Sequence, residues 1–150
     1  MRTIDFRWIT FWRDAMQTSM RKTWLQSFFG LAACSWMPHW ACHYYRLETG
    51  TSFVVGSWVF TRLDSFASLL VYTILIGINL VAISSLQWRR SAALLSGLLH
   101  LAIGSLHLFR LASPFRFEVF GHAWPLGASL REAIIVIPFG ILCLWIARRK

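Results

Sequence analysis

The chain has little charge and few of the patterns that organise enzyme chemistry. Only 14% of its 150 residues are charged, whereas 57% are hydrophobic. So little polar surface cannot cover a soluble globule of this length. The sequence has no glycine-rich loop of the kind that cradles phosphates and no motif that organises a serine or cysteine nucleophile. We therefore expect neither nucleotide chemistry nor hydrolysis.

Cysteine is also scarce, and its spacing gives no disulfide or zinc signal. Cys34, Cys42 and Cys143 form no Cys-x-x-Cys pair, and each lies in an apolar run, where a thiol acts as a small hydrophobic group. The stretch LAAC, residues 31–34, fits the lipobox of bacterial lipoprotein signals. Large apolar residues follow Cys34 where a lipoprotein would have a polar tether, so we favour a membrane helix over a processing site.

What the chain does contain is long apolar runs. Residues 66–86 carry no charge, and residues 91–109 carry none apart from two histidines. Each run reaches the roughly 20 residues that a helix needs to cross about 30 Å of hydrocarbon. Two further runs are less uniform, because each contains a proline and a few polar residues. The sequence thus predicts an all-α membrane protein with transmembrane helices at about 24–45, 64–86, 91–110 and 126–147.

Basic residues are unevenly divided between the two sides of these spans. Ten Lys and Arg residues lie at the chain ends or near residue 89, and five lie in the other two loops. By the positive-inside rule, this places both termini in the cytoplasm. The net charge of +9 is then a topology signal, and we expect no nucleic-acid partner because the chain has no soluble basic domain.

Residues 1–22 precede the first span and have an amphipathic pattern. The apolar or small residues at helical spacing are Ile4, Trp8, Phe11, Trp12, Ala15 and Ser19. Such a helix lies in the cytoplasmic interface with its aromatic face in the membrane and its arginines toward anionic headgroups. A loosely ordered tail is the alternative to this interfacial helix.

The second half of the sequence repeats features of the first at an offset of 64 residues. The matched pairs are His43 and His107, Arg46 and Arg110, Leu47 and Leu111, Phe53 and Phe117, Val55 and Val119, and Ser65 and Ser129. With one or two inserted residues, Gly56 also falls near Gly121, and Trp58 near Trp124. We interpret residues 23–86 and 87–150 as tandem helix-hairpin-helix repeats.

The loops between the paired spans have the pattern of short strands. Residues 114–124 alternate between two faces and then reach a glycine, and residues 49–60 are similar but less regular. These segments predict two β-hairpins on the outer face. Because open strand edges are not tolerated in hydrocarbon, we expect the hairpins to stay above it, where they can pair into one small sheet.

Polar and small residues share single faces of the predicted helices. The third span has Ala93, Gly97, His100, Gly104 and His107 on one face, and the second has Ser65, Ser68, Tyr72 and Asn79. Small faces allow close helix packing, so we expect Trp36 or Trp40 to fill the groove left by Gly97 and Gly104. The Asn79 amide is costly in lipid unless it faces the bundle interior.

These faces and the two His-x-x-Arg-Leu turns supply the candidate site. The candidate ligand-binding residues are His43, Arg46, His107, Arg110, His100, Tyr72 and Asn79. On a purely structural interpretation, the histidines cap helix ends or bond to a neighbouring helix. The arginines then reach phosphates or pair with Glu48 and Glu118.

Two sharper hypotheses use the same residues. One is a b-type haem held by His43 and His107, or by His39 and His100, and the other is a quinone or lipid headgroup site near His107 and Arg110. Other metal chemistry is not expected, because no carboxylate lies among these histidines within the spans.

The stretch HLFRLASPFRFEVFGHAWPLGAS, residues 107–129, resembles a pattern in small bacterial inner-membrane proteins of unknown activity. A His-Leu-aromatic-Arg-Leu turn closes one span, a β-like segment ends in Gly and Pro, and a serine opens the next span. The resemblance implies a multi-pass protein of the bacterial cytoplasmic membrane and no activity.

The function predicted from the sequence is a non-enzymatic module that binds lipid, a membrane-protein partner or a second copy of itself, without a cofactor. A redox carrier that binds haem b or a quinone is the alternative, and a small-solute transporter is the third.

Overall fold

The computed structural model describes residues 7–149, and for residues 7–15 it describes the backbone alone. Within this range the chain forms long helices joined by short strands. In chain order the elements are α1 (Arg7–Thr49), β1 (Phe53–Val55), β2 (Trp58–Val59), α2 (Arg62–Ser84), α3 (Leu86–Ala112), β3 (Phe117–Val119), β4 (His122–Ala123) and α4 (Leu126–Arg148). The helices and hairpins follow the predicted order, except that the predicted interfacial helix and first span form one helix.

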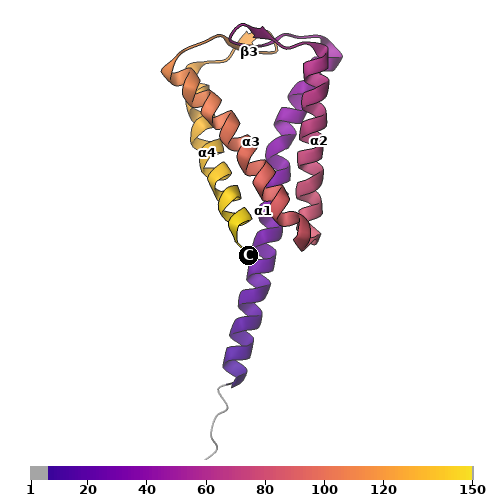
Figure 1. Ribbon diagram of the computed structural model, residues 1–150, viewed down its shortest axis with the longest axis vertical. Helices are drawn as coiled ribbons and strands as arrows, with labels where there is room; N and C mark the ends of the chain where they lie inside the picture. Colours follow the sequence, from indigo (N-terminus) through magenta and orange to yellow (C-terminus); the bar gives the residue numbers. More distant parts are fainter. Residues whose placement is uncertain (1–6, 150) are drawn as a thin grey trace, which may run out of the picture.

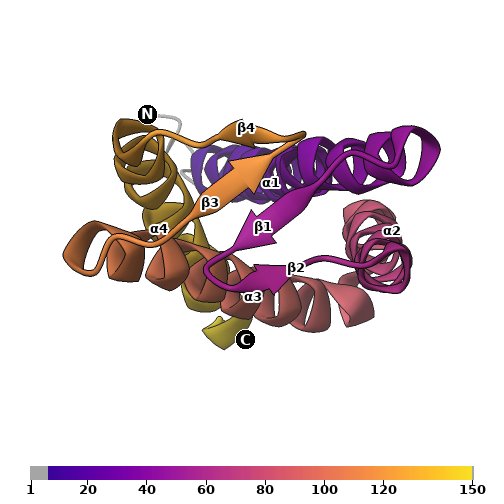
Figure 2. The ribbon, with the colours of Figure 1, turned by 90° about the horizontal axis from the view of Figure 1, so that it is seen from above.

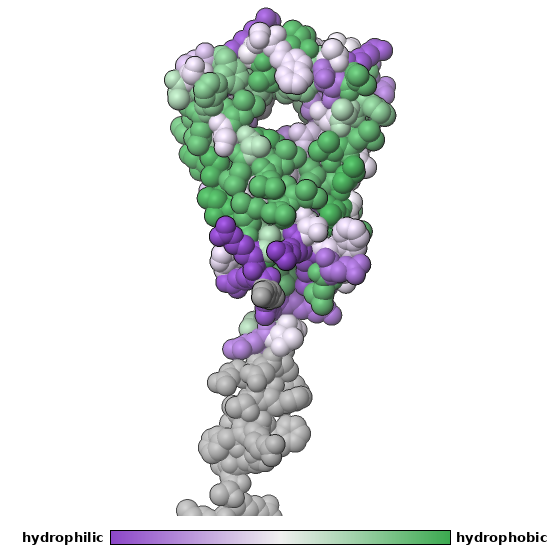
Figure 3. Space-filling model, viewed as in Figure 1, coloured by the Kyte–Doolittle hydropathy of each residue, from purple (hydrophilic) through white to green (hydrophobic). Residues whose placement is uncertain are grey.

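Three of these helices, α2, α3 and α4, are long and apolar enough to cross a membrane. Figure 3 shows the matching surface, with apolar residues over the middle of this face and polar residues at both of its ends. α1 is not among the three, although residues 24–45 carry no Lys, Arg, Asp or Glu. That stretch is rich in Trp, Tyr, His and Ser, which are less apolar than the Leu and Ile of α2 and α4. The predicted fourth span stays a prediction.

α1 is one unbroken helix of 43 residues, which at about 1.5 Å per residue is about 65 Å long. The sequence analysis divided this region at residue 22 into an interfacial helix and a first span, and the structure has no break there. No Gly or Pro occurs between Arg7 and Gly30 to interrupt the helix. The first part of α1 therefore continues along the helix axis and projects past the other helices (Figure 1). Ile4 lies outside the described residues.

The helices form two pairs that diverge toward the sheet. α1 packs along α2 and α3 along α4, and the pairs meet at the end away from the sheet (Figure 1). There Phe28 and Phe29 of α1 pack with Ala92 and Ala93 of α3 and with Cys143 of α4. This apolar contact holds the two pairs together at one end and leaves them apart at the other.

The two predicted hairpins form, and they pair into one antiparallel sheet with the strand order β2-β1-β3-β4. Figure 2 shows β1 and β3 lying side by side across the space between the two helix pairs. Both hairpins turn through two residues. Gly56, Phe120 and Gly121 have positive φ angles of 64°, 57° and 77°, as the primed turns of tight hairpins require.

The contacts of the two halves repeat at an offset of 64 residues. Phe53 pairs with Val119 and Val55 with Phe117, so the register is symmetric about the pair Val54 and Glu118. The same offset relates the hairpin bonds Phe60 N to Phe53 O, at 2.9 Å, and Trp124 N to Phe117 O, at 2.7 Å. No inserted residue is needed: Gly56 corresponds to Phe120 and not to Gly121, and Trp58 to His122 and not to Trp124.

The glycine groove of α3 is filled by α4 and not by tryptophan. A Cβ atom added at Gly97 would lie 2.8 Å from Leu144 Cδ2 and 3.0 Å from the Gly140 carbonyl oxygen, and one at Gly104 would meet Ile137. The expected packing of Trp36 or Trp40 in this groove is therefore wrong. In α1, the position that matches Gly104 is Trp40, and its indole donates to the Thr73 hydroxyl of α2 at 3.0 Å. In both halves, these matched positions therefore contact the other helix of their own pair.

Candidate functional site

The arginine of the first His-x-x-Arg-Leu turn is buried and binds the chain that leads into α2. Arg46 is 7% exposed. It donates to the backbone carbonyls of Phe60 and Thr61 and to the Ser65 hydroxyl. Nη1 reaches the Thr61 carbonyl at 2.8 Å. This guanidinium fixes the connection between β2 and α2.

Arg110 of the second turn is 6% exposed and makes the corresponding bonds. It donates to the carbonyls of Trp124 and Pro125 and, at 2.6 Å, to the Ser129 hydroxyl. Its Nε also donates to the Phe115 carbonyl at 3.2 Å. Neither Arg46 nor Arg110 forms an ion pair within the described part of the chain, because Glu118 pairs with Arg116 on the sheet instead. Arg46 Nε is buried without a hydrogen-bond partner in the described structure, and the bonds that the two arginines do make stabilise the fold.

His43 and His107 hold matching positions beneath the sheet. The ring of His43 lies 5.6 Å from that of Phe53, and the ring of His107 lies 5.7 Å from that of Phe117. Phe53 and Phe117 are themselves in edge contact at 5.7 Å. His43 Nδ1 is also 3.3 Å from the Ser65 hydroxyl, the group that Arg46 binds. The two histidines are therefore linked through the aromatic underside of the sheet.

Between the diverging helix pairs, below the sheet, an opening passes through the molecule (Figure 3). Side chains close the space at the level where α1 crosses α3. Trp36, which is fully buried, lies there with its ring 3.9 Å from that of His100. Trp36 and His100 occupy equivalent positions in the two repeats, at the offset of 64. Equivalent residues of the two repeats meet here, as Val54 and Glu118 do in the sheet. The repeat is broken chemically at this point, because one copy has an indole and the other an imidazole.

Trp36 is the centre of a cluster of rings from three helices. Its ring lies 5.8 Å from that of Tyr72 and 5.9 Å from that of His39. His39 and Tyr72 contact each other at 5.5 Å, and Tyr72 also contacts His43 at 5.8 Å. We call Trp36, His39, Tyr72 and His100 the ring cluster. His39 and Tyr72 are partly exposed, whereas the other two are buried.

Hydrogen bonds hold the buried side of the ring cluster in place. Ser96 accepts from the Trp36 indole at 3.4 Å and from the Asn79 amide at 2.8 Å. His100 Nδ1 lies 2.7 Å from the Ser96 carbonyl oxygen, so this nitrogen carries the proton, and Nε2 lies 3.2 Å from the Ser35 hydroxyl. Asn79 Oδ1 is buried without a hydrogen-bond partner in the described structure. The inward position predicted for the Asn79 amide is confirmed.

Glu132 is a partly buried carboxylate of α4 that the sequence analysis did not include among the site residues. At the offset of 64 it corresponds to Ser68, on the face assigned to the interior of the second span. No group of three or more metal-ligating side chains occurs among the described residues.

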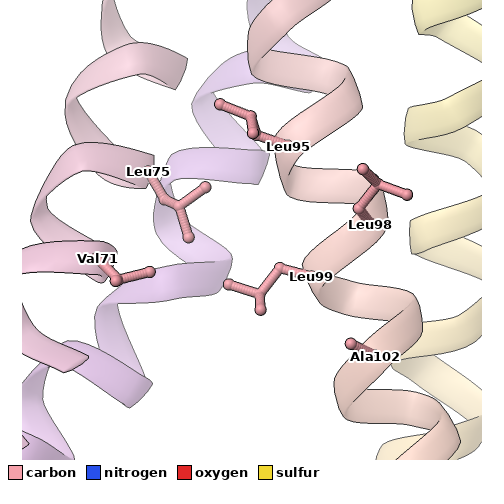
Figure 4. A pocket seen from close by; sticks show the side chains of 6 residues that line it. All are labelled: Val71, Leu75, Leu95, Leu98, Leu99 and Ala102. Carbon is pink, nitrogen blue, oxygen red and sulfur yellow. The ribbon is translucent and has the colours of Figure 1, made fainter. Parts of the chain in front are cut away.

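An apolar groove of about 390 Å³ opens between α2 and α3, next to the ring cluster. It is lined by Val71, Leu75, Leu95, Leu98, Leu99 and Ala102. Figure 4 shows Val71 and Leu75 facing Leu95 and Leu99, with α1 passing behind them. Tyr72 follows Val71 in α2 and His100 follows Leu99 in α3, and both contact Trp36 of α1. The ring cluster thus lies behind the groove.

The predicted site residues fall at two levels. His100, Tyr72 and Asn79 come together at the ring cluster, and His43 touches it through Tyr72. His107, Arg110 and Arg46 lie nearer the sheet and do not join the cluster. The comparisons with known proteins found no matching family, no similar curated protein and no solved structure with this fold.

Proposed function

We propose that the protein is a non-enzymatic integral membrane protein that binds a lipid-like molecule between its two helix pairs. In this proposal α1 also crosses the membrane through residues 24–45, which carry no acidic or basic residue other than histidine. The resemblance of residues 107–129 supports a bacterial cytoplasmic membrane. The excess of basic residues at the ends and near Arg89 supports an orientation with both termini inside. The sheet then lies on the outer surface, and the ring cluster lies within the membrane.

The observation that carries the proposal is the ring cluster behind an apolar groove. Polar rings inside a membrane are costly unless they serve a partner or a ligand. Here the buried polar groups of Trp36 and His100 are hydrogen-bonded, whereas the partly exposed Tyr72 hydroxyl makes no hydrogen bond within the described residues. An apolar groove beside a ring cluster with one free hydroxyl has the character of a small-molecule site.

Native mass spectrometry of the protein released from mild detergent tests this proposal. We expect one bound species of defined mass, displaced when Leu99→Phe fills the groove. The matched control is Ile134→Phe on α4, where the side chain is 64% exposed and lies outside the groove. Heterogeneous adducts that are equally abundant in wild type and both variants would contradict the proposal, because they would indicate ordinary annular lipid.

A second candidate function is a b-type haem site at His43 and His107. The observation that favours it is their equivalence in the two repeats, on α1 and α3, each beside a phenylalanine of the sheet. His43 and His107 would hold the haem iron through their imidazoles, and haem would supply one-electron transfer. An absorption spectrum of the oxidised and the reduced protein, with His107→Ala beside it, tests this candidate. A Soret band that shifts on reduction and is lost in the variant supports it, and a flat spectrum from protein made with ample haem rejects it.

A further inference from the structure

We propose that the bound molecule is a single-chain lipid with a flat, uncharged ring as its headgroup, the chemical class to which isoprenoid quinones belong. This inference rests on the proposed function and adds the class of the ligand. The ring binds against Tyr72 and His39, and the chain lies in the groove between α2 and α3. Binding is the whole of the proposal, and no redox step is part of it.

The groove fits one hydrocarbon chain. Its six lining side chains are all aliphatic, and its volume of about 390 Å³ is at the lower end of small-molecule sites. Figure 4 shows its lining side chains on two helices, α2 and α3, with α1 behind. The three helices whose hydropathy suits a membrane include both of its walls. A chain entering from the bilayer therefore stays in apolar surroundings along the whole groove.

The headgroup site is formed by the two partly exposed members of the ring cluster. The His39 and Tyr72 rings are 5.5 Å apart, with an interplanar angle of 38°. A planar ring packs well on such aromatic faces. The Tyr72 hydroxyl can donate a hydrogen bond to a carbonyl oxygen on that ring. Trp36 and His100 form a rigid wall behind, because hydrogen bonds and burial fix both rings.

The charges around the site disfavour a phosphate headgroup. The Nη1 and Nη2 atoms of Arg46 and Arg110 donate to backbone carbonyls and serine hydroxyls. Arg46 Nε has no partner in the described structure but is buried, so neither arginine offers its guanidinium to an anion. A neutral ring with hydrogen-bond acceptors needs no cation and still uses the Tyr72 hydroxyl.

A loading experiment tests the inference. The purified protein in mild detergent is incubated with a benzoquinone that carries a ten-carbon chain, and free quinone is removed by gel filtration. The retained quinone is then extracted and measured by absorbance. We expect saturable binding that Tyr72→Phe weakens roughly five- to tenfold, the effect of one lost hydrogen bond. His39→Asn also weakens binding, whereas His122→Asn, at an exposed position of β4, has no effect.

The arms of the experiment separate the inference from the proposed function. A parallel incubation uses phosphatidylglycerol, with phosphate as the readout, and another uses a cationic single-chain amine. One outcome is that the protein retains phosphatidylglycerol or the amine instead of the quinone, and loses it in Leu99→Phe but not in Ile134→Phe. That result would overturn the quinone class and keep the proposed function. Failure of all three probes to bind in a groove-dependent way would overturn both. Circular dichroism of each variant shows that the loss of binding is not a loss of fold.

Discussion

Replacing Arg110 tests whether the His-x-x-Arg-Leu turns stabilise the fold or bind a ligand. In the structure, the Arg110 guanidinium donates to three backbone carbonyls and one hydroxyl while 6% exposed, so Arg110→Met leaves these acceptors buried beside an apolar side chain. Hydrogen bonds to a charged donor contribute about 1.5 to 3 kcal/mol each and are not additive, so we expect a loss of roughly 3 to 5 kcal/mol in the free energy of unfolding.

Replacing Arg110 with lysine should give a smaller loss of stability than replacing it with methionine. An ammonium keeps the charge but has one nitrogen, so it cannot reach acceptors that Nε, Nη1 and Nη2 of Arg110 bind separately. We expect Arg110→Lys to cost about 1 to 2 kcal/mol. Arg46→Met should also lower stability, because the bonds of Arg46 to Phe60, Thr61 and Ser65 repeat those of Arg110 to Trp124, Pro125 and Ser129. Arg131→Met, at an exposed position of α4, is the control and should change stability by less than about 0.5 kcal/mol.

Equilibrium unfolding in mild detergent, titrated with a denaturing detergent and followed by circular dichroism, measures these differences. If Arg110→Met is as stable as Arg131→Met but retains no ligand, the structural interpretation of the turn is refuted. The arginine would then have to be counted among the ligand-binding residues.

Two further predictions concern the packing of α3 on α4 and the charge on the sheet. Gly97→Ala should lower stability by about 1 to 3 kcal/mol, because its Cβ would lie 2.8 Å from Leu144 Cδ2, whereas Gly77→Ala, with nothing within 4 Å, should be neutral or stabilising in the same unfolding assay. Arg116, which donates to Glu118 at 2.8 and 3.0 Å, holds the pKa of Glu118 below its ordinary range. The sheet should therefore lose stability as the pH falls from the ordinary pKa of a glutamate through that lowered pKa, and an acid titration of Glu118→Gln should lack this component.

The arrangement of elements could be predicted from the sequence because membrane spans and hairpins leave local signals. The apolar runs marked α2, α3 and α4, and alternation of residues marked the strands. The matched His43 and His107 also gave the repeat. A local pattern could not show whether the first predicted helix and the first predicted span are continuous. Nothing in residues 1–22 distinguishes a separate helix on the membrane surface from the beginning of one long helix.

The candidate site was predicted only in part, because its assembly depends on which helices pack first. Gly97 and Gly104 indicated close packing, but the sequence did not show that the partner is α4, so Trp36 was assigned to the wrong neighbour. Arg46 and Arg110 were expected to face lipid phosphates or glutamates, and their acceptors are backbone carbonyls, which leave no trace in a sequence. Glu132 was not considered as a site residue, although the repeat matches it to Ser68 on the inner face of the second span.

Photo-crosslinking with a lipid-like probe tests the central claim most directly. A benzoquinone with a ten-carbon chain and a photoreactive group at the chain end is added to the protein in bilayer discs, illuminated, and mapped by peptide mass spectrometry. The account predicts labelling concentrated in residues 71–75 and 95–102, and its loss in Leu99→Phe but not in Ile134→Phe. Labelling spread evenly over lipid-facing residues such as Ile134 and Ile141, and unchanged by Leu99→Phe, would contradict a binding site between the two helix pairs.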